Sequence, residues 1–287
     1  MAFNRREKLI TVFEDTINQI AVNPILAKAT KAGISNTRYY APDDYPSFEC
    51  EESCMGEITV TRHSTFEAAQ KLNVAYPPKK IAVLNFASAI NPGGGVKHGS
   101  SAQEEALCRC STLFPTLNQN RMWQQYYLVN REEKSVLHTD ACIYSPDVIV
   151  FKSSESIPKN LPTQEWFNVD VITCAAPNLR NDVNNLYNTE SGNAQIISNG
   201  DLYKLQLQRA KHILCVAAAN KANILVLGAF GCGAFRNDPR IVAQAFFDAL
   251  KDYIKCFDLV EFAIYCRDYE TENYQAFLDT YERIILF

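Results

Sequence analysis

Residues 80–95 read Lys-Ile-Ala-Val-Leu-Asn-Phe-Ala-Ser-Ala-Ile-Asn-Pro-Gly-Gly-Gly. The run over 80–86 is apolar and short, which predicts a buried strand, and the glycine-rich loop after it leads into a helix predicted over 101–114. The pattern continues along the chain, with strands predicted over 57–62, 169–174, 224–229 and 259–265, and helices over 202–219, 242–250 and 272–284. Strands that alternate with helices predict an α/β fold whose largely parallel sheet carries helices on both faces.

The N-terminal part of the chain has a different rhythm. Residues 5–32 show a helical pattern that stops at Gly33, and Ser64 and Glu67 have the spacing of a capping box that opens a short helix. The segment 142–168 contains several prolines and serines, and we expect a surface excursion there. We predict an N-terminal accessory region, residues 1–78, packed on a core formed by residues 79–287 as one structural unit.

Composition excludes several classes of protein. The 287 residues are 47% hydrophobic with a net charge of −4, which excludes a disordered chain and argues against a protein whose main role is to grip nucleic acid or an acidic membrane. The longest apolar stretch, 213–219, is too short to span a bilayer, and residues 1–7 lack the features of a secretory signal. We therefore expect a cytoplasmic protein, or a nuclear one in a eukaryote, with all ten cysteines as free thiols and no metal site.

Two glycine-rich loops follow the two most apolar strands. One contains Gly93, Gly94 and Gly95, and the other runs from Gly228 through Gly231 to Phe235. Ligands of parallel α/β sheets lie at the carboxyl ends of strands, and glycine lets backbone amides approach an anion closely. Each loop alone is explained by a tight strand-to-helix turn, but the two together favour a site that holds a diphosphate from both sides.

Two acidic residues follow the first loop. Glu104 has capping-box spacing from Ser101, and Glu105 lies four residues before Arg109, the spacing of an ordinary surface ion pair. On the helical wheel, however, Glu105 points away from the apolar stripe of its helix. A carboxylate at the mouth of a glycine loop is placed to meet a ligand, so both roles stay open for each residue.

The motifs taken together resemble one family. The triple glycine followed by Gln103-Glu104-Glu105 resembles the signature of poly(ADP-ribose) glycohydrolases of the microbial type. The stretches 85–88, 91–95, 103–111, 173–178 and 228–235 all match, and the likeness runs nearly end to end. The resemblance implies a three-layer, macrodomain-like mixed sheet as the catalytic core, with an N-terminal helical extension, and hydrolysis of the ribose-to-ribose bonds of poly(ADP-ribose), from the chain end, to release ADP-ribose.

The resemblance also implies roles for individual residues. Glu105 would protonate the leaving ribose oxygen and then activate water, while Glu104 would hold ribose hydroxyls. Phe235 would pack against the terminal ribose. The remaining substrate-binding residues that it implies are Asn91, Gly93, Gly94, Gly95, Gln103, Gly231, Cys232, Gly233 and Ala234.

Two other functions are compatible with the same fold. One is a hydrolase that acts on mono-ADP-ribosyl linkages, and the other is a module that binds ADP-ribose without cleaving it. The carboxylate of Glu105 separates them from each other, because a binding module has no need of it. All three readings imply poly(ADP-ribose) or ADP-ribosylated proteins as partners. None implies a metal, an organic cofactor, sequence-specific nucleic acid binding or a membrane, and we expect a monomer.

Overall fold

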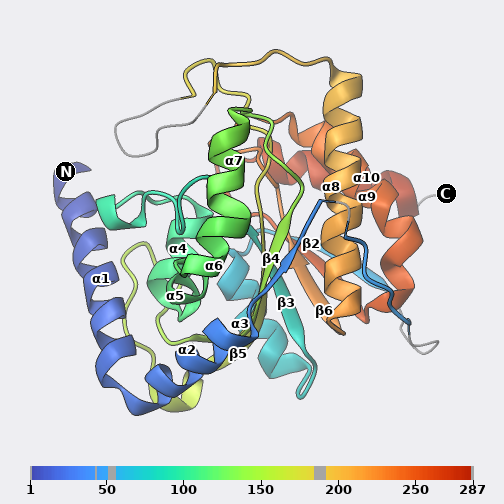
Figure 1. Cartoon of the computed structure of the whole chain (residues 1–287). Coiled ribbons are helices and arrows are strands. Elements are labelled where there is room, and N and C mark those ends of the chain that lie inside the picture. The colour runs from blue at the N-terminus through green and yellow to red at the C-terminus, as the bar shows by residue number, and fades with distance from the viewer. Residues whose placement is uncertain (1, 43, 51–55, 184–191, 286–287) are drawn as a thin grey trace.

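The computed structural model describes residues 2–42, 44–50, 56–183 and 192–285, and within these ranges the chain forms a mixed seven-stranded sheet between layers of helices (Figure 1). The spatial order of the strands is β1-β4-β5-β3-β6-β7-β2. Strands β3, β5, β6, β7 and β2 are parallel, and β4 and β1 extend the sheet in antiparallel pairs. The bounds are β1 Arg38–Tyr40, β2 Glu57–Thr61, β3 Ile81–Phe86, β4 Cys142–Val150, β5 Phe167–Cys174, β6 Ile224–Leu227 and β7 Leu259–Ala263. The predicted α/β class with a mixed, largely parallel sheet is confirmed.

Helices cover both faces of this sheet. Helices α8, α9 and α10 enclose one hydrophobic core, and α1, α3, α4 and α5 enclose another on the opposite face. The bounds are α1 Ala2–Val22, α2 Pro24–Asn36, α3 Thr65–Ala75, α4 Gln103–Cys110, α5 Leu113–Leu117, α6 Asn120–Met122, α7 Leu128–Glu133, α8 Asn199–Ala219, α9 Pro239–Tyr253 and α10 Glu272–Ile285. Short 3₁₀ turns span Val96–His98, Thr163–Glu165 and Ile254–Cys256, and a π-helical turn spans Trp123–Tyr127.

Strand β3 lies at the centre of the sheet and contributes to both cores. Ala82 and Leu84 face one core, and Ile81 and Val83 face the other. A parallel strand buried on both faces requires apolar residues at consecutive positions, which is the pattern of residues 81–84. The predicted strand over 80–86 is therefore confirmed, and it fixes the place from which the first glycine loop leaves the sheet.

Three predicted elements differ from the structure. The segment 142–168 is not a surface excursion, because it includes β4, where a bulge at Pro146 and Asp147 interrupts the apolar pattern. The helix predicted over 5–32 is two helices, since the side chain of Asn23 caps α2 and Pro24 occupies its first turn. The helix predicted over 101–114 is also two elements, α4 and α5, and begins at Gln103.

The N-terminal 78 residues are part of the sheet as well as of the helical layers. They supply β1 at one edge and β2 at the other, and β2 pairs with β7 from Glu57↔Leu259 to Thr61↔Ala263. The capping box predicted at Ser64 and Glu67 is confirmed at the start of α3. The division of the chain at residue 78 stays a prediction.

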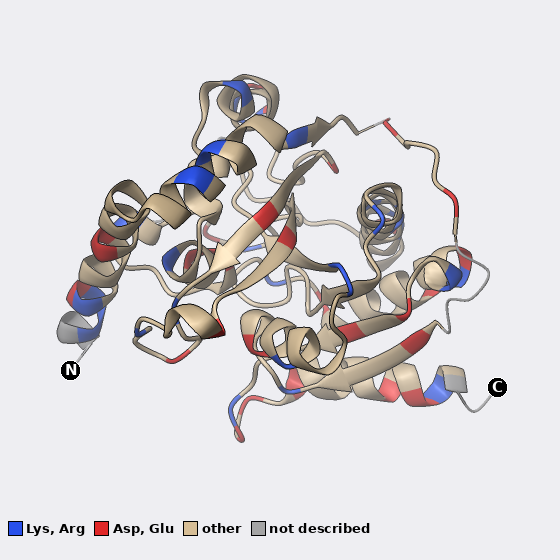
Figure 2. Cartoon of the chain, turned by 90° about the horizontal axis from the view of Figure 1, so that it is seen from below, with Lys and Arg blue, Asp and Glu red and all other residues tan. Residues whose placement is uncertain are grey.

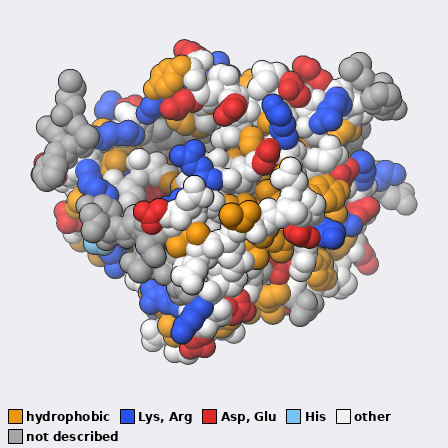
Figure 3. Space-filling view, turned by 90° about the horizontal axis from the view of Figure 1, so that it is seen from above, with side chains coloured by type: hydrophobic (Ala, Val, Ile, Leu, Met, Phe, Trp, Pro, Cys, Tyr) orange, Lys and Arg blue, Asp and Glu red, His pale blue; other side chains and the backbone are white. Residues whose placement is uncertain are grey.

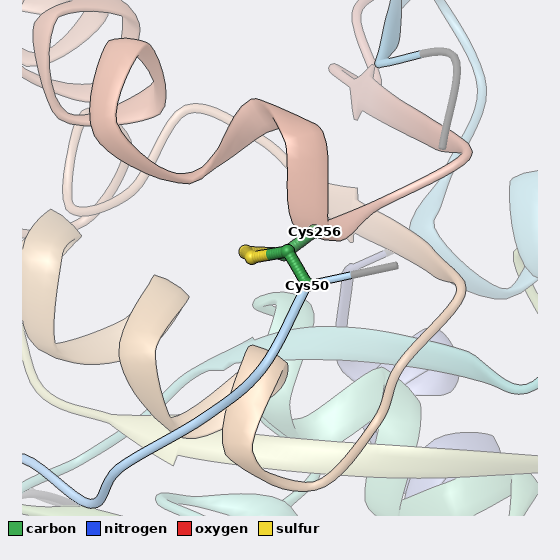
Figure 4. The surroundings of a disulfide bond; sticks show 2 residues. All are labelled: Cys50 and Cys256. Carbon is green, nitrogen blue, oxygen red and sulfur yellow. A yellow bond between two sulfur atoms is a disulfide. The ribbon is translucent and has the colours of Figure 1, made fainter. Parts of the chain in front are cut away.

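The prediction that all cysteines are free is wrong for one pair. Cys50 and Cys256 form a disulfide across 206 positions of sequence (Figure 4). Their segments run together because Gly56 and Glu57 donate backbone hydrogen bonds to Phe257 and Asp258, a long-range pairing that no local pattern reveals. Seven cysteines are free, as predicted, namely Cys108, Cys110, Cys142, Cys174, Cys215, Cys232 and Cys266; Cys54 lies outside the described residues.

Charges of both signs are spread over the molecule. Acidic and basic residues are interspersed along the helices near both termini (Figure 2), and the face seen in Figure 3 mixes basic, acidic and apolar side chains. A polyanionic ligand must therefore be bound by a local arrangement of groups rather than by a broad basic surface. None of the helices within the described ranges has the length and apolar character needed to cross a bilayer.

Candidate active site

The two glycine-rich loops leave neighbouring strands at the same edge of the sheet. Strands β3 and β6 are parallel partners, with Ile81 opposite Ile224, so the loops that follow them emerge side by side. The last residue of β3 also contacts the second loop, since the rings of Phe86 and Phe230 lie 5.9 Å apart in an edge-to-face arrangement. The predicted convergence of the two loops is confirmed.

Gly94 brings the first loop close to both carboxyl groups. Its φ is +54°, and its amide donates to the carbonyl of Asn91 at 3.0 Å. A Cβ at this position would lie 2.7 Å from Oε1 of Glu105 and 3.1 Å from Oε2 of Glu104. Only glycine allows this turn so close to two carboxyl groups, because any other side chain would meet both the strain of positive φ and a steric overlap.

Glu104 is buried beneath the loop, with 3% of its surface exposed. Its Oε2 accepts a hydrogen bond from the amide of Ser88 at 2.7 Å, and its Oε1 accepts from the amide of Gly93 at 3.2 Å and from Nδ2 of Asn85 at 3.4 Å. The capping box predicted with Ser101 is absent, because the cap of α4 is Ala102 and Glu104 is aimed at the loop instead. Burial raises the pKa of Glu104 well above its usual value.

Glu105 lies in the same enclosed space, with 7% of its surface exposed. Its Oε1 accepts a hydrogen bond from the amide of Gly95 at 2.9 Å, whereas its buried Oε2 has no hydrogen-bond partner among the described residues. Burial raises the pKa of Glu105, which favours the protonated acid. The carboxyl group therefore lies at the glycine loop, as predicted, and one of its oxygens is left without a partner in the described part of the chain.

Glu105 and Arg109 do not form a surface ion pair, the alternative role that their spacing left open, because both side chains are buried. Arg109 is buried, and its Nη1 donates to the carbonyl of Ser100 at 2.6 Å instead. The spacing of four residues is correct for a helical pair, but the helix α4 presents this face to the loop and to α1 rather than to solvent.

The side chain of Gln103, another predicted ligand-binding residue, forms hydrogen bonds within the protein. The oxygen of the Gln103 side chain accepts from the amide of Phe86 at 2.9 Å, and its Nε2 donates to the carbonyl of Leu84 at 2.7 Å and to Oγ1 of Thr65 at 3.1 Å. Gln103 thus fastens the first turn of α4 to β3, while Glu104 and Glu105 after it contact the loop.

Asn91 is held by a residue that the sequence pattern did not reveal. Nη2 of Arg131 donates to Oδ1 of Asn91 at 2.7 Å, and Nε of Arg131 donates to the carbonyl of Ile90 at 2.9 Å. The guanidinium also lies over the ring of Trp123, 4.9 Å from its centroid. No local signal marks Arg131, because it is remote in sequence and the helix that carries it, α7, was not predicted.

The second loop is fixed at one end and open in its middle. Gly231 has φ +76°, and Asn237, another residue that sequence reasoning missed, donates from Nδ2 to the carbonyls of Gly231 at 3.1 Å and of Pro177 at 2.7 Å. A Cβ on Gly233 would meet nothing within 4 Å. The exposed turn of Gly233 and Ala234 therefore leaves its backbone accessible to a ligand.

Cys232 and Phe235 have different environments in this loop. Cys232 is buried, and burial raises the pKa of its thiol, so it is a packing residue rather than a nucleophile. The ring of Phe235 is partly exposed, with the guanidinium of Arg180 5.8 Å from its centroid and the ring of His138 at 6.1 Å. Burial lowers the pKa of His138 to about 3, so this neighbour of Phe235 is neutral at physiological pH.

A family model for the catalytic domain of microbial-type PARG, poly(ADP-ribose) glycohydrolase, matches residues 15–153. The structure of the Deinococcus radiodurans enzyme, a T267R mutant in complex with ADP-ribose, is 33% identical, with a TM-score of 0.75 over 89% of this chain and 98% of that one. The chain belongs to the microbial-type poly(ADP-ribose) glycohydrolase family. The Thermomonospora curvata enzyme of this family, bound to the inhibitor ADP-HPD, is 28% identical, with a TM-score of 0.77 over 96% of this chain and 99% of that one. No curated protein sequence matches the chain.

Membership of this family covers the whole fold. The comparison with the Thermomonospora enzyme includes both the N-terminal helices and the sheet, because it spans nearly the full length of each chain. The family predicted from the triple glycine and Gln103-Glu104-Glu105 is thus confirmed.

Proposed function

We propose that this glycohydrolase family member hydrolyses the ribose-to-ribose O-glycosidic bonds of poly(ADP-ribose) and releases ADP-ribose. One observation carries the proposal: the carboxyl group of Glu105 lies against the triple glycine through Oε1, and its other oxygen, Oε2, is buried without a hydrogen-bond partner among the described residues. A carboxyl group in this position has no structural use for its second oxygen. It is placed to exchange a proton with a bound sugar.

The two loops hold the substrate in this mechanism. The amides of the triple-glycine loop and of residues 231–234 bind the diphosphate, and this fixes the adjoining ribose against Glu105. Asn91, kept in place by Arg131, lines the sugar site. The oxygens of Glu104 already accept hydrogen bonds from Ser88 and Gly93, so its first task is to shape the loop, and it orients ribose hydroxyls from that fixed position.

A single carboxyl group serves as both acid and base. Glu105 donates its proton to the leaving ribose oxygen as the glycosidic bond breaks, and the resulting carboxylate removes a proton from the water that attacks the anomeric carbon, which restores the acid. Glu104 and Glu105 are adjacent on α4 and cannot flank a bond from opposite sides, as the paired carboxylates of most glycosidases do.

The substrate also assists this proton transfer. The negative charge of a bound diphosphate and the exclusion of water both raise the pKa of Glu105 beyond the effect of burial in the free protein. A titration of Glu105 with and without ADP-ribose tests this step, and an identical pKa in both states would contradict it.

The finer features of the proposal concern the mode of attack and the setting. Phe235, backed by Arg180 and His138, packs against the terminal ribose and favours cleavage from the chain end. A seven-stranded mixed sheet with glycine loops at one edge supports a macrodomain core. We further propose that the protein acts as a cytoplasmic monomer without sequence-specific binding of nucleic acid.

The test compares labelled poly(ADP-ribose) and a mono-ADP-ribosylated protein as substrates. Glu105→Gln keeps the size of the side chain and removes the acid, so we expect a loss of hydrolysis of about 10²-fold or more, with binding of ADP-ribose retained. Glu282→Gln, on the exposed side of α10, is the matched control. Unchanged cleavage by Glu105→Gln would place the chemistry elsewhere, and cleavage of the mono-ADP-ribosylated protein alone would replace the proposed substrate.

A further inference from the structure

The N-terminal helix α1 contacts the triple-glycine loop at His98 and Gly99. Nε of Arg6 donates to the carbonyl of His98 at 2.7 Å. Gly99, with φ +70°, lies against the same residue, since a Cβ there would come 2.5 Å from the carbonyl oxygen of Arg6 and 2.7 Å from its Cγ. Backbone and side chain of one α1 residue therefore fit against two consecutive residues of the loop.

The turn contacted by α1 is the one that holds Glu105. Within residues 95–100, the amide of Ser100 donates to the carbonyl of Gly95 at 3.2 Å, which closes the turn. The amide of Gly95 then donates to Oε1 of Glu105. On the inner side, the guanidinium of Arg109 holds the carbonyl of Ser100. A displacement of His98 or Gly99 is thus transmitted to Gly95 through a single closed turn.

A second set of contacts joins α1 to the same machinery. The rings of Phe13 and Phe114 pack edge to face with centroids 5.0 Å apart, and Phe114 in turn lies against Gly93, where a Cβ would come 2.9 Å from the ring. Oγ1 of Thr16 donates to the carbonyl of Arg109 at 2.6 Å. Three successive parts of α1 therefore meet the loop, its aromatic support and the helix that carries Glu105.

We propose that α1 is a positioning element of the active site, and that Arg6 is the positioning residue that holds the turn 95–100 against Glu105. The proposal rests on the role of Glu105 in the proposed function. The hydrogen bond from Arg6 to His98 acts on Glu105 through the position of the Gly95 amide. Because Arg6 is at the half-exposed end of α1, its removal loosens the turn without opening the core beneath Phe13.

The experiment uses Arg6→Ala, with Lys8→Ala as a control that removes the same charge from an exposed position of the same helix. Truncation of Arg6 should lower kcat on poly(ADP-ribose) about tenfold, since small displacements of a catalytic group are costly, while KM and the affinity for ADP-ribose stay within about twofold. Arg6→Lys, which keeps a donor for His98, should restore part of the rate. Hydrogen exchange should become faster at the Gly95 amide in Arg6→Ala and stay unchanged in Lys8→Ala.

The two proposals fail in distinguishable ways. If wild type hydrolyses the polymer and Arg6→Ala matches Lys8→Ala in kcat and in exchange at Gly95, the positioning role is overturned and the proposed function stands. If wild type does not hydrolyse the polymer, the proposed function fails, and exchange at Gly95 alone decides whether α1 holds the turn. A loss of kcat in Lys8→Ala as large as that in Arg6→Ala would also overturn a specific role for Arg6.

Discussion

Replacing Gly94 by alanine should damage catalysis far more than it damages stability. The new Cβ would lie 2.7 Å from Oε1 of Glu105, whereas an ordinary contact begins near 3.4 Å, so the carboxyl group must move by about 0.7 Å. A displacement of 1 Å costs about 100-fold in rate, which predicts a fall in kcat of about 30-fold. The left-handed backbone at Gly94 adds a cost of about 1–2 kcal/mol to folding, equivalent to a fall in melting temperature of about 2–6 °C.

The assay measures release of ADP-ribose from labelled polymer at saturating substrate, together with a thermal melt. Gly200→Ala is the matched control, because Gly200 lies in the first turn of α8 and its new Cβ would have Ser198 Oγ as nearest neighbour at 3.8 Å. The control should keep the kcat of wild type and should not lower its melting temperature, because alanine is a better helix former than glycine. A folded Gly94→Ala enzyme with kcat within about twofold of wild type would refute the argument that the loop must pass this close to Glu105.

Three further predictions concern stability and covalent structure. In wild type the pKa of Glu104 is higher in the folded state than its unfolded value near 4.5, so the free energy of unfolding should fall as pH rises above that value. Urea unfolding between about pH 5 and about pH 8 should show a weaker pH dependence of this free energy in Glu104→Gln than in wild type. An equally strong pH dependence in the variant would contradict the raised pKa. Asn23→Ala removes the acceptor for the amides of Ile25 and Leu26, so the free energy of unfolding in urea should fall by about 1 kcal/mol while kcat stays unchanged. An unchanged free energy of unfolding would show that the cap does not stabilise the protein. Alkylation of the denatured, unreduced chain should leave Cys50 and Cys256 unmodified in peptide mass mapping; labelling of both would show that the disulfide is absent.

Local patterns predicted the parts of the fold that depend on neighbouring residues. The continuous apolar run of β3 indicates a doubly buried strand, and the spacing of Ser64 and Glu67 indicates a cap, because both features are decided within a few residues. Strand β4 escaped prediction because its bulge at Pro146 and Asp147 breaks the apolar pattern, and the register with β5 that keeps it in the sheet is a long-range interaction.

The sequence predicted which residues form the candidate site, but not that its two glutamates are buried. The glycines and the two glutamates were recognised, since their spacing and their order along the chain carry the signal. Their burial was not, because the loop folds over α4 and turns a face that looks solvent-exposed on a helical wheel into an enclosed one. Arg131, Asn237 and Arg6 hold the loops from other elements, and such residues carry no mark in the sequence.

Strand β2 is synthesised long before β7, the strand with which it pairs in the sheet. Its partner in the sheet, β7, begins at Leu259, about 200 residues after Glu57, so at about 5–20 residues per second the ribosome takes roughly 10–40 s to supply it. During this time the backbone N–H and C=O groups of β2 lack the strand with which they pair in the folded protein, and contacts of such long range are slow to form. The nascent chain thus carries β2 without its partner until β7 emerges about 200 residues later, and an unpaired strand edge of this kind is prone to pair with other chains in the meantime.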